Sequence, residues 1–342
     1  MRPQIPQQPS VYPRCIAQGQ HFASGEAHGK AILLGEHAAI YGAPALAFPM
    51  PALKCRVTVR QRPAPSLLAS RLCRVTPGLQ GATAETVIDM PEEFLALLTA
   101  FAESAGLGAP PAMDIYLDSC IPPSRGLGSS AANARALVRA LDAFFATVLD
   151  EQSVFDLVQV SERSAHGMAS GIDALATGSE QPVLLADGRL RTPAVGADLH
   201  LVVIDSGSGP GGTRRAVEIL RDAFAQNPVE RTRFVHRSTA LTEAALVDMA
   251  AGRLSSLGQH LTACHQMLAN LGLTTSRTDA LAHMALDAGA LGAKMTGGGL
   301  GGCVVALTRS APQAALVSTR LTDRAGVQTW IIGTRRDRYD RP

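Results

Sequence analysis

Hydrophobic and polar positions along the chain follow two periodicities, which together predict a mixture of strands and helices. Residues 54–60 and 113–119 alternate with a period of two, as half-buried strands do. After Ser130, apolar residues recur at steps of three and four, which predicts a long helix with one buried face. That face consists of Leu137, Val138, Leu141, Phe144, Phe145, Val148 and Leu149. A second helix is expected to begin near Ser153, a good N-cap residue, and to stop at Gly167.

The second half of the chain predicts several helices between short strands. Residues 200–205 form an apolar run typical of a buried strand, and a turn-rich segment at 188–198 precedes it. Helices are expected at 213–226, 232–250, 254–270 and 278–290, and strands near 303–308 and 328–333. We therefore expect a loose N-terminal arm over 1–20, an N-terminal domain over 21–196 and a C-terminal domain over 197–342.

Composition narrows the class of protein. A length of 342 residues fits two domains, and 46% hydrophobic with 18% charged residues is ordinary for a globular protein. The net charge of +2 and the few aromatic residues argue against nucleic acid or a membrane surface as a general partner. No apolar leader and no long uncharged stretch is present, so a cytoplasmic location is expected. The six scattered cysteines contain no C-x-x-C pair, which argues against a zinc site.

A glycine- and serine-rich loop at residues 121–132 lies between a predicted strand and the long helix. Glycine lets backbone N–H groups approach a ligand, and the start of a helix offers unpaired N–H groups with partial positive charge. Such a loop can cradle a phosphate, and the hydroxyls of Ser129 and Ser130 can bond a phosphate oxygen or a magnesium ion. A tight turn capped by serine gives the same pattern, so the loop alone leaves both interpretations open.

Two known phosphate motifs provide alternatives for this loop. A Walker loop is excluded, because no lysine stands at its end. The dinucleotide fingerprint is matched by Gly126-x-Gly128-x-x-Ala131 and by Gly207-x-Gly209-x-x-Gly212, which leaves an NAD(P)-dependent oxidoreductase as an alternative. That fingerprint needs a strand after its helix, whereas both loops are followed by further helical pattern, so the match is weak.

Phosphoryl transfer also needs ligands for Mg²⁺ and a group that orients the attacking hydroxyl. The candidates are Glu162 near a helix end, Asp173 just after a helix, Lys30 before an apolar run, and the adjacent pair Glu36 and His37. Taken singly, each is better explained as a solvated or turn residue, and Glu162 as a surface residue. Only their joint arrangement favours a catalytic site.

That arrangement resembles the GHMP kinase superfamily. Three blocks carry the resemblance, at residues 29–42, 122–132 and 294–303, and within the superfamily the first block is most similar to the mevalonate kinases. The stretch 162–173 resembles their segment that pairs a metal-binding Glu with a catalytic Asp. The resemblance implies an α+β fold with a ribosomal S5-like N-terminal domain, a ferredoxin-like C-terminal domain and an active site between them.

The resemblance also implies an activity, which is ATP-dependent phosphorylation of the primary 5-hydroxyl of mevalonate. Phosphomevalonate or homoserine remains an alternative substrate. The sequence leaves the oligomeric state open, with a homodimer as one option because dimers are frequent among relatives. Ser130 and Glu162 would ligate Mg²⁺, and Asp173 would accept or orient the hydroxyl proton beside Lys30. Glu36, His37 and Thr213 would complete the substrate pocket with Lys30 and Asp173. The nucleotide would be bound by Pro122, Pro123, Ser124, Arg125, Gly126, Leu127, Gly128, Ser129, Ser130, Ala131 and Ala132.

Overall fold

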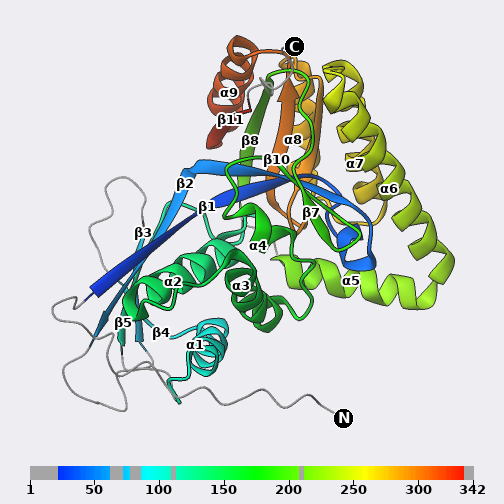
Figure 1. Cartoon of the computed structure of the whole chain (residues 1–342). Coiled ribbons are helices and arrows are strands. Elements are labelled where there is room, and N and C mark those ends of the chain that lie inside the picture. Colours follow the sequence, from blue (N-terminus) through cyan, green and yellow to red (C-terminus); the bar gives the residue numbers. More distant parts are fainter. Residues whose placement is uncertain (1–21, 62–71, 78–85, 109–112, 208–211, 335–342) are drawn as a thin grey trace, which may run out of the picture.

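Two β-sheets, each with helices packed against it, organise the part of the chain that the computed structural model describes (Figure 1). The described residues are 22–61, 72–77, 86–108, 113–207 and 212–334. Helices and sheets are both extensive, so the predicted α+β class is confirmed. None of the helices in these ranges combines the length and apolar character that a bilayer crossing demands.

The first sheet has seven strands, in the order β4-β3-β5-β2-β6-β7, with β1 paired to β2. Its strands are β1 (Phe22–Leu34), β2 (Ala45–Gln61), β3 (Leu72–Pro77), β4 (Thr86–Asp89), β5 (Met113–Ser119), β6 (Val183–Ala186) and β7 (Arg189–Arg191). A short 3₁₀ turn, η2 (Ala38–Tyr41), joins β1 to β2. Three helices lie together against one face of this sheet: α1 (Glu92–Ser104), α2 (Ser129–Phe145) and α3 (Glu151–His166).

The long predicted helix is α2, and its boundaries differ from the sequence-based ones. Leu137, Val138 and Leu141 are buried as expected, because they face the first sheet. The helix ends at Phe145, however, and Val148 is 88% exposed, so its assignment to the buried face is wrong. A backbone turn into the left-handed region at Ala146 ends the helix before the apolar pattern does.

The start of α3 is a second correction. The helix begins at Glu151, and its N-cap is Asp150, whose carboxylate accepts a hydrogen bond from the Ser153 backbone N–H. Ser153 therefore lies in the first turn rather than at the cap, because an acceptor three residues earlier takes the capping position. Gly167 ends the helix, as predicted.

The second sheet is antiparallel throughout, in the order β11-β8-β10-β9. Its strands are β8 (Leu199–Gly207), β9 (Gly292–Thr296), β10 (Gly302–Thr308) and β11 (Thr329–Thr334). The chain reaches β9 from β8 through helices, turns directly into β10, and reaches β11 through one more helix. This β-α-β-β-α-β path is the ferredoxin-like arrangement expected for the C-terminal half.

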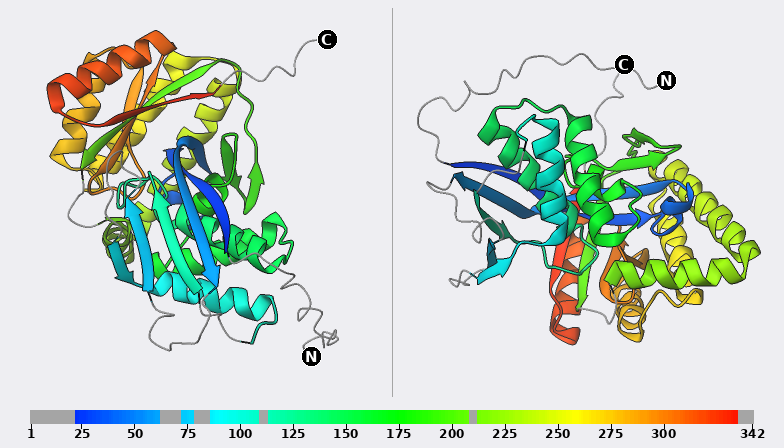
Figure 2. Two further views of the ribbon diagram at one scale, coloured as in Figure 1. Left: turned by 90° about the vertical axis from the view of Figure 1, so that its left-hand side faces the viewer. Right: turned by 90° about the horizontal axis from the view of Figure 1, so that it is seen from below.

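Helices cover both faces of the second sheet (Figure 2). The helices are α5 (Gly212–Gln226), α6 (Pro228–Ala250), α7 (Leu254–Asn270), α8 (Ser276–Asp287) and α9 (Ala311–Ala325). Val202 and Ile204 of β8 join the apolar cluster under α8 and α9, whereas Leu201 and Val203 join the cluster on the α7 side. Both faces of this strand are therefore buried, which explains its continuous apolar sequence.

The sequence prediction left α1 and α9 out, although each has a regular apolar face. In α9 the buried residues are Ala314, Val317 and Leu321, and the N-cap is Ser310. The predicted helix at 232–250 starts earlier, at Pro228, and the one at 278–290 ends earlier, at Asp287. Strands of the first sheet lie within residues 22–191 and those of the second within 199–334, while the domain division at residue 196 stays a prediction.

A reciprocal pair of hydrogen bonds joins the two sheets. The hydroxyl of Thr296 in β9 donates to the Ile32 carbonyl oxygen at 2.8 Å, and the Ile32 N–H donates back to the hydroxyl at 2.9 Å. Ile32 lies in β1, two residues after Lys30. The contact therefore places β9, and the glycine-rich segment that follows it, close to Lys30 in the first sheet.

Candidate active site

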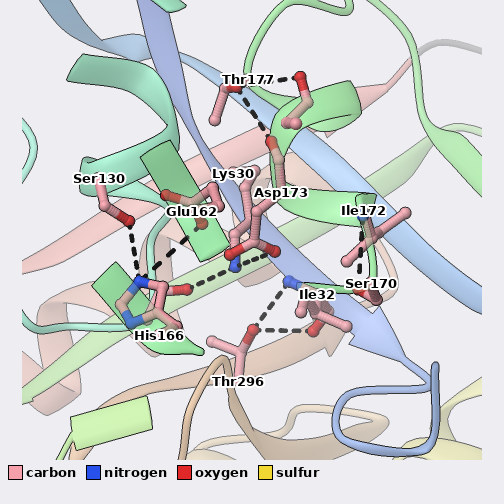
Figure 3. Close-up of polar contacts among 12 residues, drawn as sticks. Lys30, Ile32, Ser130, Glu162, His166, Ser170, Ile172, Asp173, Thr177 and Thr296 are labelled. Atoms are coloured by element: carbon pink, nitrogen blue, oxygen red, sulfur yellow. Dashed lines mark hydrogen bonds and ion pairs between the residues drawn. The ribbon is translucent and has the colours of Figure 1, made fainter. Parts of the chain in front are cut away.

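Lys30 lies where the two sheets meet, and its side chain is 1% exposed (Figure 3). Its Nζ atom is 3.1 Å from Oδ1 of Asp173 and donates to the Gly126 carbonyl oxygen at 3.0 Å. Asp173 lies in the first turn of α4 (Ile172–Ala176). Its side chain is 33% exposed and lines the phosphate cavity described below. A buried ammonium group needs such partners, because burying an unpaired charge is costly. The structure thus joins the two predicted catalytic residues directly.

Ser130, Glu162 and His166 form a second polar group beside this pair (Figure 3). The Ser130 hydroxyl is 3.2 Å from Nε2 of His166, and the same nitrogen is 3.9 Å from Oε2 of Glu162. Glu162 is 3% exposed, and its Oε1 atom has no hydrogen-bond partner. The interpretation of Glu162 as a surface residue is therefore wrong, since α3 turns it inward.

Burial also changes the acidity of Glu162. Loss of hydration, and then the nearby charge of Asp173, raise the pKa of the Glu162 carboxyl group to about 7, against a smaller lowering by the Ser130 hydroxyl. A carboxylate with these surroundings is stabilised by a cation placed at its free oxygen. Ser130 and Glu162 thus offer hard oxygen donors in the place where the sequence predicts a metal.

The phosphate loop lines a cavity of about 360 Å³ that opens at the N-terminus of α2. The helix begins after Gly128, whose φ of 73° turns the backbone into it. Six of the predicted nucleotide residues line this cavity: Pro123, Ser124, Gly126, Gly128, Ser129 and Ser130. The unpaired N–H groups of the first helical turn therefore point to an anion site.

The other residues predicted to bind the nucleotide do not line this cavity. The side chains of Leu127, Ala131 and Ala132 are buried in the core, so their part is packing rather than side-chain contact with a ligand. Nε of Arg125 pairs with Oδ1 of Asp205 in β8 at 2.8 Å, and neither Arg125 nor Pro122 lines the cavity.

The opposite wall of this cavity is the glycine-rich segment within the third block, residues 294–303. Gly298, Gly299, Gly301 and Gly302 of this segment line the cavity. The segment also touches the phosphate loop directly. A Cβ atom on Gly297 would lie 2.4 Å from the Cα of Gly126, and one on Gly126 would lie 2.8 Å from the Thr296 carbonyl oxygen. Only glycine allows these two backbones to approach so closely.

A smaller cavity of about 80 Å³ lies on the other side of Lys30 and Asp173, and we call it the substrate pocket. All five residues predicted to contact the substrate line it: Lys30, Glu36, His37, Asp173 and Thr213. His37 has a φ of 60°, which turns the chain sharply into η2. Burial, and then the charge of Lys294, lower the pKa of His37 to about 4, so its ring is neutral at pH 7.

Three further polar residues belong to this region, although no role was predicted for them. Lys294 in β9 forms a buried ion pair with Glu36. The signal that could have revealed it is that Lys294 is the only charged residue in the five-residue strand β9, all of which is buried. Gln159 lines the substrate pocket three residues before Glu162, and this spacing on one helix could have indicated it. His166 contacts Ser130 and Glu162, as described above.

The dinucleotide alternative does not fit this topology. β8 ends at Gly207 and has antiparallel neighbours on both sides, β10 and β11, whereas the fingerprint requires a parallel βαβ unit. The helix that begins at Gly212, α5, leads into α6 and not into a neighbouring strand. Gly209 itself lies outside the described residues.

Comparison with known proteins agrees with this arrangement. Residues 93–180 match the family model for the GHMP kinases N terminal domain, and residues 245–327 match the GHMP kinases C terminal model. A mevalonate kinase of Aeropyrum pernix is 33% identical over 300 residues, covering 83% of this chain and 88% of that protein. A mevalonate kinase of Pyrococcus horikoshii is 28% identical, covering 84% of this chain and 88% of the relative.

Solved structures point to the same fold. L. major mevalonate kinase in complex with R-mevalonate has a TM-score of 0.72 at 24% identity, covering 90% of this chain and 95% of that one. Mevalonate kinase from a methicillin-resistant Staphylococcus aureus has a TM-score of 0.63 at 27% identity, covering 91% and 98%. A galactokinase of Lactococcus lactis, complexed with galactose, has a TM-score of 0.72 at 20% identity, covering 92% and 94%.

Proposed function

The chain belongs to the GHMP kinase family, and we propose that it transfers the γ-phosphoryl group of ATP to the primary 5-hydroxyl of mevalonate. The products are 5-phosphomevalonate and ADP. The observation that carries this proposal is the Lys30–Asp173 pair, which lies between the glycine-walled phosphate cavity and the smaller substrate pocket. Relatives named mevalonate kinase, matched over most of the chain, support mevalonate as the acceptor.

The proposed chemistry follows from the position of Asp173. In the proposed complex the 5-hydroxyl of mevalonate donates its hydrogen bond to the Asp173 carboxylate, which orients the oxygen toward the γ-phosphorus. The new oxygen–phosphorus bond forms as the bond to the ADP oxygen breaks, and the hydroxyl proton passes to Asp173. Lys30 holds the Asp173 carboxylate in place through their ion pair and lies beside the γ-phosphoryl group as negative charge shifts in the transition state.

Mg²⁺ is part of the proposal because the available donors suit it. Mg²⁺ binds through one or two protein oxygens together with phosphate oxygens and water. Ser130 lines the phosphate cavity, and Glu162, with its unpaired Oε1 atom, lines the substrate pocket next to it, so the two side chains provide such oxygens from neighbouring cavities. When bound, the ion neutralises phosphate charge and orients the γ-phosphoryl group.

The charge of the substrate pocket favours mevalonate over phosphomevalonate. Among the described residues that line the pocket, Lys30 is the only lysine or arginine, and it is already paired with Asp173. Mevalonate already brings one carboxylate, and phosphomevalonate would add the charge of a phosphate to it without a free cation in the pocket to receive it. Phosphomevalonate and homoserine therefore serve as the competing substrates in the test.

The test is ADP release by the purified protein with mevalonate, phosphomevalonate or homoserine, each at several concentrations with Mg·ATP. The highest kcat/KM is expected with mevalonate, and phosphorus NMR should place the new phosphate on the primary hydroxyl. A higher kcat/KM with either competitor would assign the site to that substrate, and no ADP release with any of them would reject all three as acceptors.

A further inference from the structure

Several side chains in the wall of the substrate pocket have a buried polar atom without a hydrogen-bond partner. In the described part of the chain these atoms are Oε2 of Glu36, Nε2 of His37, Oε1 of Gln159 and Oε1 of Glu162. Buried polar atoms in folded proteins are nearly always paired, so unpaired ones in a pocket wall indicate groups that a ligand supplies. Substrate contact is predicted for Glu36 and His37, and metal binding for Glu162, whereas Gln159 has no predicted role.

The position of Gln159 is fixed relative to the reacting groups. It is 9% exposed and precedes Glu162 by three residues on α3, which is about 4.5 Å along the helix axis. Its amide packs against Gly171, where a Cβ atom would lie 3.3 Å from Nε2 of Gln159 and 3.1 Å from the Phe155 ring. Gly171 is the N-cap of α4, two residues before Asp173. The amide is therefore held against the turn that carries Asp173.

The chemistry of the amide limits what it can recognise. A glutamine side chain is neutral and combines an acceptor oxygen with donor N–H groups, and its free oxygen needs a donor. A carboxylate or phosphate of the substrate has no proton to donate to that oxygen, whereas a hydroxyl has one. The partner of Oε1 is therefore expected to be a hydroxyl group, distinct from the one at Asp173.

We propose that Gln159 determines substrate specificity by accepting a hydrogen bond from a second hydroxyl of the substrate, which in mevalonate is the tertiary hydroxyl on C3. The inference rests on the proposed function, because it takes mevalonate as the acceptor. It assigns a task to the amide that neither phosphoryl transfer nor metal binding requires. Gln159 thus selects a dihydroxy acid over a chain of the same length with only the terminal hydroxyl.

The experiment compares kcat/KM for mevalonate and for 5-hydroxy-3-methylpentanoate, which lacks the tertiary hydroxyl. Wild-type protein is expected to prefer mevalonate by about 100-fold or more, because the deoxy compound leaves the buried oxygen unpaired. Gln159→Met keeps the length of the side chain and removes the acceptor. It should lose most of this preference by falling in activity with mevalonate alone, mainly through a higher KM.

Gln152→Met is the matched control. Gln152 lies on the same helix, is exposed, donates to Asp156 and lies outside the substrate pocket. This variant should keep the wild-type preference between the two compounds. A circular dichroism melt of each variant verifies that it is folded.

Each other outcome has a definite meaning. Equal losses with both compounds in Gln159→Met, or an unchanged preference, would overturn the specificity role. Wild-type protein that uses the deoxy compound as well as mevalonate would overturn it without any variant, even if Gln159→Met did not fold. Wild-type protein that phosphorylates neither compound would instead reject mevalonate as the substrate, and the role of Gln159 with it.

Discussion

Lys294 and Glu36 form an ion pair that is closed off from solvent, with side-chain exposures of 0% and 2%. The two residues are 258 positions apart in the sequence, Lys294 in the second sheet and Glu36 just after the end of β1. The lysine also donates to the carbonyl oxygen of Met295. The pair therefore fixes Glu36 in the wall of the substrate pocket from the opposite half of the molecule.

Replacing Lys294 by methionine should destabilise the fold strongly, because Glu36 would keep a buried charge without a partner. The expected loss is about 3–5 kcal/mol in the free energy of unfolding, measured by urea denaturation. Arg215→Met is the matched control, because Arg215 pairs with Glu218 on the exposed face of α5. It should cost less than about 1 kcal/mol. Equal losses in the two variants would contradict a stabilising buried pair.

The buried His37 should make stability depend on pH. Its pKa is about 4 in the folded protein against 6.5 ordinarily, so the unfolded chain binds a proton first as the pH falls. The stability that the depressed pKa of His37 gives the folded protein is fully present above pH 6.5 and is lost as the pH falls toward 4. The free energy of unfolding should therefore fall by about 2 kcal/mol between pH 7 and pH 5. Urea denaturation at both pH values measures it.

The variant that isolates this effect is His37→Asn, since asparagine tolerates the left-handed backbone at this position. The raised pKa of Glu162 acts in the opposite direction but is common to both proteins. Wild-type protein should therefore lose more stability on acidification than His37→Asn does. The same loss in both would show that His37 does not titrate as its burial requires.

Asp173→Asn should abolish most of the activity while the protein stays folded. The amide keeps the shape of the side chain but cannot accept the hydroxyl proton, so kcat should fall by about 100- to 10,000-fold. Asp222→Asn, on the exposed face of α5, is the matched control and should keep full activity. Near-normal turnover in folded Asp173→Asn would remove this residue from the catalytic role.

Gly297→Ala tests the close approach of the two glycine-rich segments. Both Gly297 and Gly326 have positive φ, so alanine costs about 1–2 kcal/mol of backbone strain at either position. Only at position 297 does the new methyl group overlap another backbone, that of Gly126, whereas Gly326 has open space around it. Gly297→Ala should therefore lose about 1–3 kcal/mol more than Gly326→Ala in urea denaturation, together with activity. Indistinguishable variants would show that the two segments tolerate separation.

The strands and helices that could be predicted are those whose buried positions carry large apolar residues. β5 has the predicted bounds because Met113, Ile115 and Leu117 alternate with polar residues. The first half of β1 gave no such signal, because its buried positions are Ala23, Gly25 and Ala27. They are small because α2 lies directly on them: a Cβ atom on Gly25 would be 2.3 Å from the Ala136 carbonyl oxygen.

The residues of the site could be predicted from the sequence, but their contacts with one another could not. Lys30, Glu162 and Glu36 could each be a solvent-exposed residue by local pattern, and nothing near them in the sequence shows that they are buried. Their partners come from remote segments, as Asp173 does for Lys30 and Lys294 for Glu36. Burial of a charge and the partner that compensates it are both products of the tertiary fold, so local pattern could not reveal either.

The paired hydrogen bonds between Ile32 and Thr296 join the two sheets two residues from Lys30. The phosphate cavity is lined by the loop before α2 on one side and by Gly298, Gly299, Gly301 and Gly302 on the other. A nucleotide bound there would contact both halves of the molecule at once. Its binding is therefore expected to stabilise both halves together against unfolding.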